Sequence, residues 1–363
     1  MGECRQCEGD LAKRRGRMAA LLGPRGLAIR AAQFPGPAAM KALLCTRYGT
    51  PDDLTFADIP EPVPGPGEVV VHVEAAALNF FDTLIIANKY QTKPPLPFSP
   101  AAECAGTVEA LGSGVTQVAM GDRVMAYTGY GAARERIAIS VDKLVKIPDK
   151  LDVDRAAGLC VTYGTTLHAL KDRAKLNAGE TLAVLGASGG AGLAAVELGK
   201  LMHARVIACA SSATKIAFAC KHGADDGIDY GTEDLKEALR RVTQGRGADV
   251  IYDPVGGTYA EPALRSIAWK GRFLVVGFAA GEIPKLPLNL VLLKGCDVLG
   301  VFWGSWIERD PAGHRANTEQ LLTWCSEGKL SSHVHKVYPL AEAPAAFKAI
   351  AARQVMGKVI LRP

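Results

Sequence analysis

The spacing of hydrophobic and polar positions changes about halfway along the chain. From Met40 to about Val161, apolar and polar residues alternate in short runs. Examples are EPVPGPGEVVVHVEAAALN, ECAGTVEALGSGV and GDRVMAYTGYGAARERIAI, in which Gly and Pro interrupt the pattern at intervals of roughly eight to twelve residues. A period of two with such interruptions predicts a twisted, β-rich domain of partial-barrel type.

From about Thr181 the pattern becomes strand, helix, strand. Six apolar runs, TLAVLG, RVIACAS, DGIDY, DVIYDPVG, RFLVVGF and DVLGVFWG, alternate with helical stretches such as EDLKEALRRVTQ. This alternation predicts a parallel, doubly wound sheet with helices on both faces. After Trp303 the chain returns to helix and mixed structure and ends in a strand, GKVILRP. We therefore predict an α/β protein in which 165–303 form the doubly wound domain, and 40–164 with 304–363 form a discontinuous first domain.

The first 39 residues do not share either pattern. The arginines at 14, 15, 17, 25 and 30 are interleaved with Ala, Gly and Pro and show no helix or strand period. Three interpretations remain open: a leader that is not part of the native protein, a disordered tail, or an Arg-rich organelle-targeting segment. Cys4 and Cys7 form a single CxxC pair, which lacks the second pair that a zinc site needs. We leave 1–39 out of the predicted fold.

Composition narrows the class of protein. The chain has 363 residues, of which 48% are hydrophobic and 22% charged, and no run of about eighteen uncharged apolar residues predicts a membrane span. A net charge of +5 from 42 basic and 37 acidic residues is too weak to indicate nucleic-acid binding. Nine scattered cysteines favour buried thiols in a reducing compartment, so we expect a cytoplasmic protein.

The stretch LGASGGAG carries the first candidate chemistry. Gly186, Gly189 and Gly192 are three residues apart, directly after a predicted strand and at the start of the helix AGLAAVELGKLM. This spacing allows a tight turn, close approach to a pyrophosphate and close packing of helix on strand, with free N–H groups at the helix start. Ser188 and Gly190 complete the loop. The stretch predicts a dinucleotide site.

The end of the second parallel strand indicates which dinucleotide binds. An NAD site carries Asp or Glu about 20 residues after the glycines, whereas this chain has Ser211, Ser212 and Lys215. Two hydroxyls and an ammonium can bind the 2′-phosphate of NADP, and no carboxylate repels it. Lys215 as an ordinary solvated helix lysine is the alternative. We expect NADPH as the cofactor.

Several stretches carry a resemblance to a known family: ALNFFDTLI, GSGVTQVAMGDRVMAY, LGASGGAGLAAVELGK, GADDGIDY, DVIYDPVGG and FWGSW. From Met40 to Pro363 the chain resembles the medium-chain dehydrogenase/reductase superfamily, in its zinc-free quinone oxidoreductase (ζ-crystallin-like) branch. The resemblance implies a GroES-like β-rich catalytic domain beside a Rossmann NADP-binding domain. Zinc-dependent members carry a cysteine near the position of Asn79 and a His-Glu pair at Ala102 and Glu103. Because Asn and Ala cannot replace thiolate and imidazole ligands, we expect no metal.

The resemblance also implies catalytic residues. Asn79 and Asp82 match a motif at the nicotinamide end of the cleft, where Asn79 orients substrate or cofactor; alternatively, both residues only fix the loop through backbone hydrogen bonds. Tyr90 follows Asn79 by eleven residues and matches a tyrosine of related enoyl reductases that stabilises or protonates the enolate. Packing of a loop is the other interpretation of Tyr90.

Further positions are implied to border the cofactor. They are Thr165 near the nicotinamide ribose, Tyr230 beside the 2′-phosphate or adenine, and Gly256, Gly277, Phe278 and Phe302 at the ends of the fourth, fifth and sixth parallel strands. Arg353 and Lys358 are candidates for the diphosphate end, with ordinary surface charge as the alternative.

These observations predict an NADPH-dependent oxidoreductase that transfers hydride to a quinone or an α,β-unsaturated carbonyl without zinc. An enoyl-CoA or acryloyl-CoA reductase on the same fold is one alternative, and an NADPH-binding structural or sensor protein with little turnover is another. The sixth parallel strand, DVLGVFWG, is apolar on both faces. We expect it to pair with its mate in a homodimer, because that would cover an exposed strand edge.

Overall fold

The computed structural model describes residues 38–363, so the interpretations of the leader and of Cys4 and Cys7 lie outside the described part. The helices are α1 Phe80–Ile86, α2 Val153–Ala157, α3 Cys160–Leu167, α4 Gly190–Leu201, α5 Ala213–Lys221, α6 Leu235–Val242, α7 Ala260–Arg265, α8 Leu288–Lys294, α9 Trp303–Arg309, α10 Pro311–Ser326 and α11 Ala343–Ala351. Short 3-10 turns lie at Pro51–Asp53, Val141–Lys143, Gly257–Tyr259 and Leu340–Glu342, and a π turn at His168–Arg173. In this part of the chain, no helix has the length and apolar character needed to cross a membrane.

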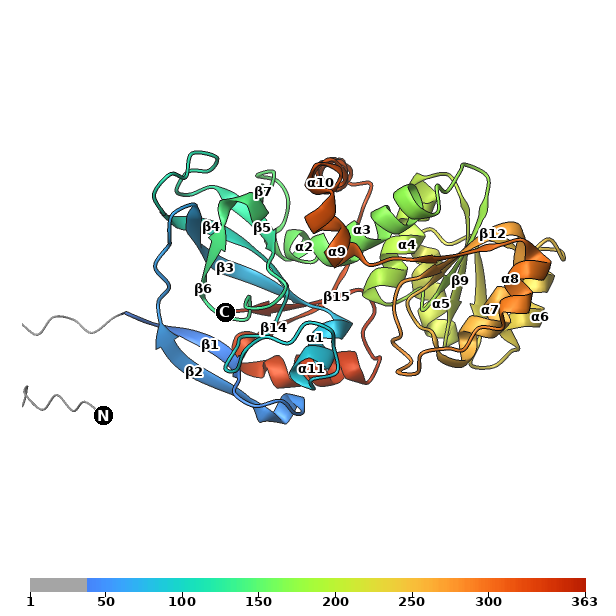
Figure 1. Cartoon of the computed structure of the whole chain (residues 1–363), viewed down its shortest axis with the longest axis horizontal. Coiled ribbons are helices and arrows are strands. Elements are labelled where there is room, and N and C mark those ends of the chain that lie inside the picture. The colour runs from blue at the N-terminus through green and yellow to red at the C-terminus, as the bar shows by residue number, and fades with distance from the viewer. Residues whose placement is uncertain (1–37) are drawn as a thin grey trace, which may run out of the picture. The chain divides into compact units, whose positions relative to one another are not determined.

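The first and last parts of the described chain share one sheet (Figure 1). Its strands run in the order β14, β15, β3, β4, β5 and β7, with β6 also paired to β3, while β1 and β2 form a separate hairpin. These strands are β1 Ala39–Cys45, β2 Leu54–Pro60, β3 Glu68–Leu78, β4 Glu103–Leu111, β5 Arg123–Tyr127, β6 Arg136–Ser140, β7 Leu144–Lys146, β14 Val334–Pro339 and β15 Lys358–Arg362. The C-terminal strand β15 therefore lies directly beside β3, which ends at the residue before Asn79.

The central part of the chain forms a six-stranded sheet in the order β10, β9, β8, β11, β12 and β13, with every adjacent pair parallel. The strands are β8 Thr181–Leu185, β9 Arg205–Ala210, β10 Asp226–Asp229, β11 Ala248–Asp253, β12 Ile267–Val275 and β13 Asp297–Gly300. All six predicted strands are present, and the fold class, a β-rich domain with a doubly wound sheet, is confirmed. β8 is buried throughout because it lies inside the sheet, whereas β13 forms one edge.

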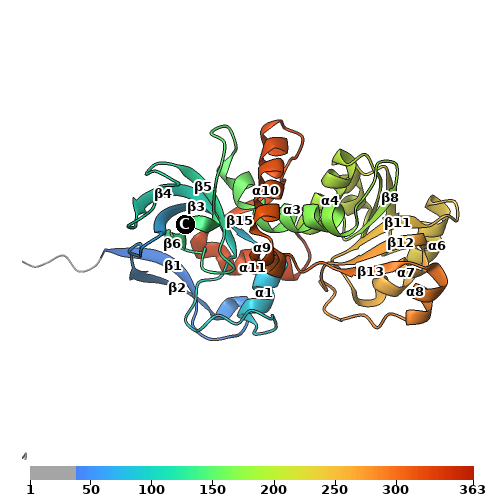
Figure 2. The same cartoon turned by 45° about the horizontal axis from the view of Figure 1, so that its top comes forward.

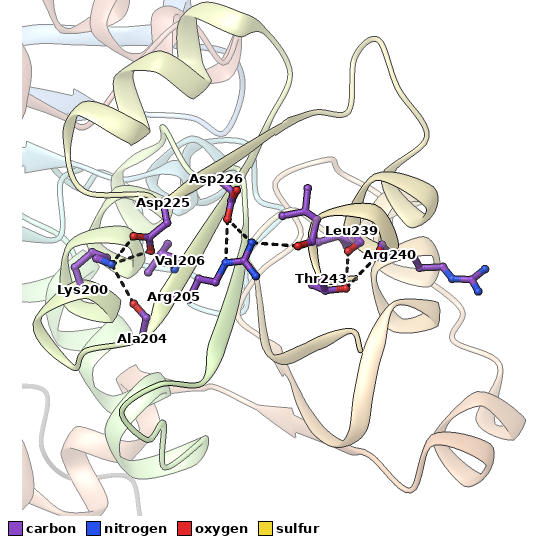
Figure 3. Close-up of polar contacts among 10 residues, drawn as sticks. Lys200, Ala204, Arg205, Val206, Asp225, Asp226, Leu239, Arg240 and Thr243 are labelled. Atoms are coloured by element: carbon purple, nitrogen blue, oxygen red, sulfur yellow. Dashed lines mark hydrogen bonds and ion pairs between the residues drawn. The ribbon is translucent and has the colours of Figure 1, made fainter. Parts of the chain in front are cut away.

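Ion pairs at the amino ends of β9 and β10 fix this side of the sheet (Figure 3). The Lys200 ammonium lies 2.8 Å from both carboxylate oxygens of Asp225, whose backbone precedes β10. Arg205, the first residue of β9, donates to Asp226, the first residue of β10, at 2.6 and 3.0 Å, and to the carbonyl of Val242 at 3.1 Å. Because the strands are parallel, these pairs lie at the end of the sheet opposite the glycine loop, which follows the carboxyl end of β8.

The helices after β13 pack on the segment that precedes β8. α10 contacts α3 (Figure 2), and the ammonium of Lys171 donates to the side chain of Asn317 at 2.8 Å. Asn317 in turn donates to Asp172 at 2.9 Å. The buried face of α10 therefore covers α3 and the π turn, and it places Trp303 in α9 against Gly164 of α3.

Candidate functional site

The glycine loop has the conformation that a dinucleotide site requires. Gly186 has φ of +63°, a region that residues with a side chain rarely adopt, and Gly189 precedes the first turn of α4. A methyl group on Gly192 would lie 2.1 Å from the carbonyl oxygen of Gly186, so this position has room for hydrogen alone. The first N–H groups of α4 therefore point toward the carboxyl end of β8, where an anion can bind them.

A cationic side chain lies at the carboxyl end of β9. Lys215 donates to the hydroxyl of Ser211 at 3.1 Å and to the main-chain oxygen of Arg353 at 3.0 Å. The hydroxyl of Ser212 accepts from the backbone N–H of Lys215 and so caps α5. Neither Lys215 nor Arg353 forms an ion pair with an acidic side chain within residues 38–363. This cluster can bind a phosphate group at its exposed face.

Aromatic rings and a buried acid lie along the carboxyl edge of the parallel sheet. The ring of Tyr230 lies 4.3 Å from that of Tyr259, and burial raises the pKa of Tyr230. Asp253, the last residue of β11, accepts from the backbone N–H groups of Val255 and Gly256 at 2.8 Å each, and burial raises its pKa to about 6 although both bonds lower it. These bonds hold the turn after β11, where Gly256 has φ of +65°.

Two further predicted cofactor residues meet at that same turn. A methyl group on Gly256 would lie 2.9 Å from the ring of Phe278, and one on Gly277 would lie 3.3 Å from the carbonyl oxygen of Pro254. The loops after β11 and β12 therefore pack closely, as expected for backbone that borders a ligand. Phe302 precedes α9 and is 61% exposed, while Thr165 in α3 is partly buried.

A buried polar cluster surrounds Asn79 at the end of β3. The Asn79 amide donates from Nδ2 to Glu103 at 2.9 Å, and its Oδ1 accepts from the ammonium of Lys358 at 2.7 Å. Lys358 also donates to Glu103 at 2.8 Å, and the second oxygen of Glu103 accepts from the N–H of Val161 at 2.8 Å. Glu103 thus serves as a hydrogen-bonded structural acid.

This cluster revises one position predicted from sequence. Lys358 was expected at the diphosphate end of the cofactor, but its side chain is 3% exposed and its ammonium is held among three buried oxygens. The cause is strand register: β15 pairs antiparallel with β3, and the first residue of β15 therefore comes opposite Asn79. Arg353, the other residue expected there, accepts from Lys215 with its main-chain oxygen and donates from its guanidinium to the carbonyl oxygens of Ala279 and Ala280.

Asp82 has the most perturbed carboxyl group of this region. It is 1% exposed, its Oδ2 accepts from the backbone N–H of Asn79 at 2.7 Å, and its Oδ1 has no partner among the described residues. Burial raises the pKa of Asp82 to about 7, against the lowering effect of the Asn79 N–H and of the Lys358 charge. A substantial fraction of Asp82 is therefore a neutral acid near pH 7, with a proton available on the unpartnered side.

Two tyrosines lie near Asp82, and only one was expected. Tyr90 stacks on Phe81 with ring centroids 5.3 Å apart, and burial and the nearby Asp82 raise its pKa. Tyr127, at the end of β5, contacts the Trp303 ring edge to face at 5.0 Å, and its pKa is raised by burial, then by Tyr90 and Asp82. Tyr127 was not predicted from the sequence. The available signal was its place as the last residue of a strand that ends at the same sheet edge.

The donor set around Asn79 does not suit a zinc ion. Within residues 38–363, no group of three or more His, Cys, Asp or Glu side chains is arranged to hold a metal. Glu103 already receives an ammonium, an amide N–H and a backbone N–H. The Lys358 ammonium also places a positive charge beside Glu103, which disfavours a second cation at this carboxylate.

Comparison with known proteins agrees with this geometry. The family described as "Alcohol dehydrogenase GroES-like domain" matches 65–149, and the one described as "Zinc-binding dehydrogenase" matches 190–326. The chain is 36% identical over 323 residues to the rat quinone oxidoreductase-like protein 2, covering 88% of this chain and 91% of that protein. It is 34% identical over 325 residues to a quinone oxidoreductase of Pseudomonas aeruginosa, covering 89% and 99%.

A solved structure extends the likeness to the whole fold. The crystal structure of Escherichia coli quinone oxidoreductase complexed with NADPH superposes with a TM-score of 0.82 at 27% identity, covering 90% of this chain and 99% of that one. The two family matches cover 65–149 and 190–326, and the relatives above 30% identity and the superposition cover 88–90% of the chain. The protein therefore belongs to the medium-chain dehydrogenase/reductase superfamily, in its quinone oxidoreductase branch, and is an oxidoreductase.

Proposed function

We propose that this protein is an NADPH-dependent reductase that transfers a hydride to a quinone or an α,β-unsaturated carbonyl without a zinc ion. The observation that carries the proposal is the ammonium of Lys215 beside the hydroxyl of Ser211 at the end of β9. An acidic residue there would accept ribose hydroxyls, whereas an ammonium without an acidic partner in the described part favours a 2′-phosphate. The Escherichia coli relative binds NADPH in its solved structure.

The polar cluster around Asn79, at the end of the site proposed for the nicotinamide, determines which acceptors fit. Bound NADPH supplies a hydride from C4 of its nicotinamide, and the acceptor also takes up one proton, so that a quinone becomes a hydroquinone. Because an amide and an ammonium occupy the position next to Glu103, the site favours acceptors that delocalise the incoming charge onto a carbonyl oxygen. Quinones and conjugated carbonyls have this property.

The residues of the pocket have distinct tasks in this proposal. Asn79 has one N–H that Glu103 does not use, and this N–H can orient a carbonyl group of substrate or cofactor. Tyr90 and Tyr127 are candidate proton donors, since their raised pKa values keep both phenols protonated. The charge of Asp82, when ionised, raises the pKa of both phenols further.

The first experiment measures oxidation of NADPH and of NADH at the nicotinamide absorbance, with 9,10-phenanthrenequinone and with crotonyl-CoA as acceptors. Preference for NADPH with turnover of the quinone supports the proposal. Turnover of crotonyl-CoA alone would replace it with an enoyl thioester reductase, in which a tyrosine protonates the enolate. Tight NADPH binding without turnover of either acceptor would favour a structural or sensor role.

We also propose that the protein forms a homodimer through the edge strand β13, which pairs only with β12 among the described strands. Large apolar side chains next to this edge are exposed: Trp269, Ile283, Leu288, Leu292, Leu293 and Val298. Light scattering should give twice the mass of one chain, and Leu292→Glu should give a monomer. Every cysteine in the described part is a free thiol, which fits the reducing cytoplasm that we propose as its location.

A further inference from the structure

Lys358 faces Asn79 across two paired strands. The antiparallel register joins Val359 to Leu78 and Ile360 to Ala77, so the next step of the same register places Lys358 opposite Asn79. The ammonium donates to Asn79 Oδ1 at 2.7 Å, to Glu103 at 2.8 Å and to the main-chain oxygen of Leu78 at 3.2 Å. All three of its hydrogens have partners, and none is left for a cofactor phosphate.

The two charges select one orientation of the Asn79 amide. Its oxygen lies against the Lys358 ammonium and its NH2 group against the Glu103 carboxylate. Rotating the amide by half a turn would place NH2 against the ammonium and oxygen against the carboxylate, and both contacts would then be repulsive. The remaining N–H of Asn79 consequently has a fixed direction.

The same segment of chain also contacts the glycine loop. The N–H of Gly357 donates to the carbonyl oxygen of Ser188 at 2.9 Å, and Gly357 forms an isolated bridge with Gly189. The side chain of Lys358 passes over the start of α4, because a methyl group on Gly190 would lie 3.3 Å from its Cδ. Two adjacent residues therefore connect the backbone of the glycine loop to the amide of Asn79.

We infer that Lys358 is a positioning residue: it sets the direction of the Asn79 amide, and it ties that direction to the glycine loop. The inference rests on the proposed function for its effect on turnover, but the geometry it describes is independent of any acceptor. Lys358 acts through Asn79 and does not bind the cofactor diphosphate.

Three variants and one control test this role. Lys358→Met removes the ammonium but keeps a chain of similar length, Glu103→Gln removes the partner charge, and the double variant removes both. Lys336→Met is the matched control, since Lys336 lies on the neighbouring strand β14, is exposed, and contacts only the ring of Tyr338 with its ammonium. Each variant is measured for urea stability, NADPH Kd by fluorescence, and kcat at saturating NADPH.

Lys358→Met should be clearly destabilised, because a buried carboxylate loses its counter-ion. The double variant should recover most of that stability and still show kcat about 10- to 100-fold below wild type, since the amide is no longer held. Its NADPH Kd should stay within about twofold of wild type, as should every value for the control. Recovery of kcat together with stability would overturn the inference, and so would a tenfold rise in NADPH Kd with kcat unchanged.

A second readout separates this inference from the proposed function. The side-chain NH2 resonances of Asn79, assigned by comparison with Asn79→Asp, report the surroundings of the amide without any turnover. They should move in the double variant and stay in place in Lys336→Met. If wild type fails to oxidise NADPH with every acceptor tested, the proposed function fails while these resonances still test Lys358. Unmoved resonances in the double variant would overturn the inference itself.

Discussion

Removing the ammonium of Lys215 should weaken NADPH binding and leave NADH binding unchanged. The side chain is half-buried, and its two partners, the hydroxyl of Ser211 and the main-chain oxygen of Arg353, are neutral acceptors. The ammonium therefore has no acidic partner that must be displaced before a phosphate binds. Lys215→Ala also keeps α5 intact, because the cap of that helix comes from Ser212 and needs only the backbone N–H at this position.

The expected loss of binding free energy follows from the partial exposure of the Lys215 side chain. A hydrogen bond to a charged group contributes about 1.5–3 kcal/mol, and solvent screening at a partly exposed site favours the lower end of this range. A loss of about 1.4 kcal/mol corresponds to a tenfold change in affinity. We therefore expect Kd for NADPH to rise about tenfold in Lys215→Ala, and to rise further, by less than the sum of the separate losses, when Arg353 is removed as well, because the two residues are in contact. Arg353→Gly is the suitable second change, since φ at this position is +56°.

The assay is titration of nicotinamide fluorescence with NADPH and with NADH at two ionic strengths. Wild-type affinity for NADPH should fall with added salt, and the salt dependence should be smaller in the variant. Lys200→Ala is a matched control, because Lys200 pairs with Asp225 at the opposite end of the sheet (Figure 3). An equal loss of affinity for both cofactors in Lys215→Ala would refute the assignment of this cluster to the 2′-phosphate.

Three further predictions concern the loop and the pocket. Gly192→Ala should lose about 1–3 kcal/mol of stability by overpacking, since the new methyl group would meet Gly186 at 2.1 Å; urea unfolding measures this. Asp82 has a pKa of about 7 in the folded chain against 3.8 in the unfolded chain. Its ionisation therefore lowers the free energy of unfolding increasingly as pH rises from 4 to 7. Asp82→Asn should remove this cost, up to about 4 kcal/mol at pH 8 and almost none at pH 3, in unfolding curves at both pH values. Tyr90→Phe and Tyr127→Phe identify the proton donor: the variant that lacks it should have kcat lower by about 10²-fold or more. The other variant should have kcat near wild type, and stopped-flow traces measure both.

Each of these predictions has an outcome that contradicts it. Gly189→Ala is the control for the loop, because a methyl group there would lie 3.6 Å from its nearest neighbour; equal losses of stability in both glycine variants would contradict the packing argument. A stability difference between wild type and Asp82→Asn that does not change with pH would show that Asp82 has the same pKa in the folded and the unfolded chain. Full activity in the double Tyr90→Phe, Tyr127→Phe variant would mean that solvent supplies the proton.

The fold was largely predictable because its signals are local. Each parallel strand is a short apolar run followed by a helix, and the glycine spacing depends on backbone geometry within eight residues. Asn79, the proposed catalytic asparagine, could also be identified from a local motif. These features need no knowledge of which distant segments pair, and for that reason the order of elements could be deduced from the sequence.

The surroundings of Asn79 could not be deduced in the same way. Lys358 is 279 residues away in the chain, and it reaches Asn79 only because β15 pairs with β3 in one particular register. A shift of one residue would turn Lys358 to the other face of the sheet. Tyr127 escaped notice for a related reason, since its place opposite Glu103 depends on the register of β4 and β5.

The short segment 353–358 contacts the proposed cofactor site at three points. At Arg353 its backbone accepts from Lys215, at the end assigned to the 2′-phosphate. At Gly357 it bonds to the glycine loop, and at Lys358 it holds Asn79 at the end assigned to the nicotinamide. Because the segment continues into β15, which lies between β14 and β3, it is anchored in the sheet of the first domain. A change in the backbone of the glycine loop on cofactor binding would therefore be transmitted to the amide that faces the acceptor, through two adjacent residues.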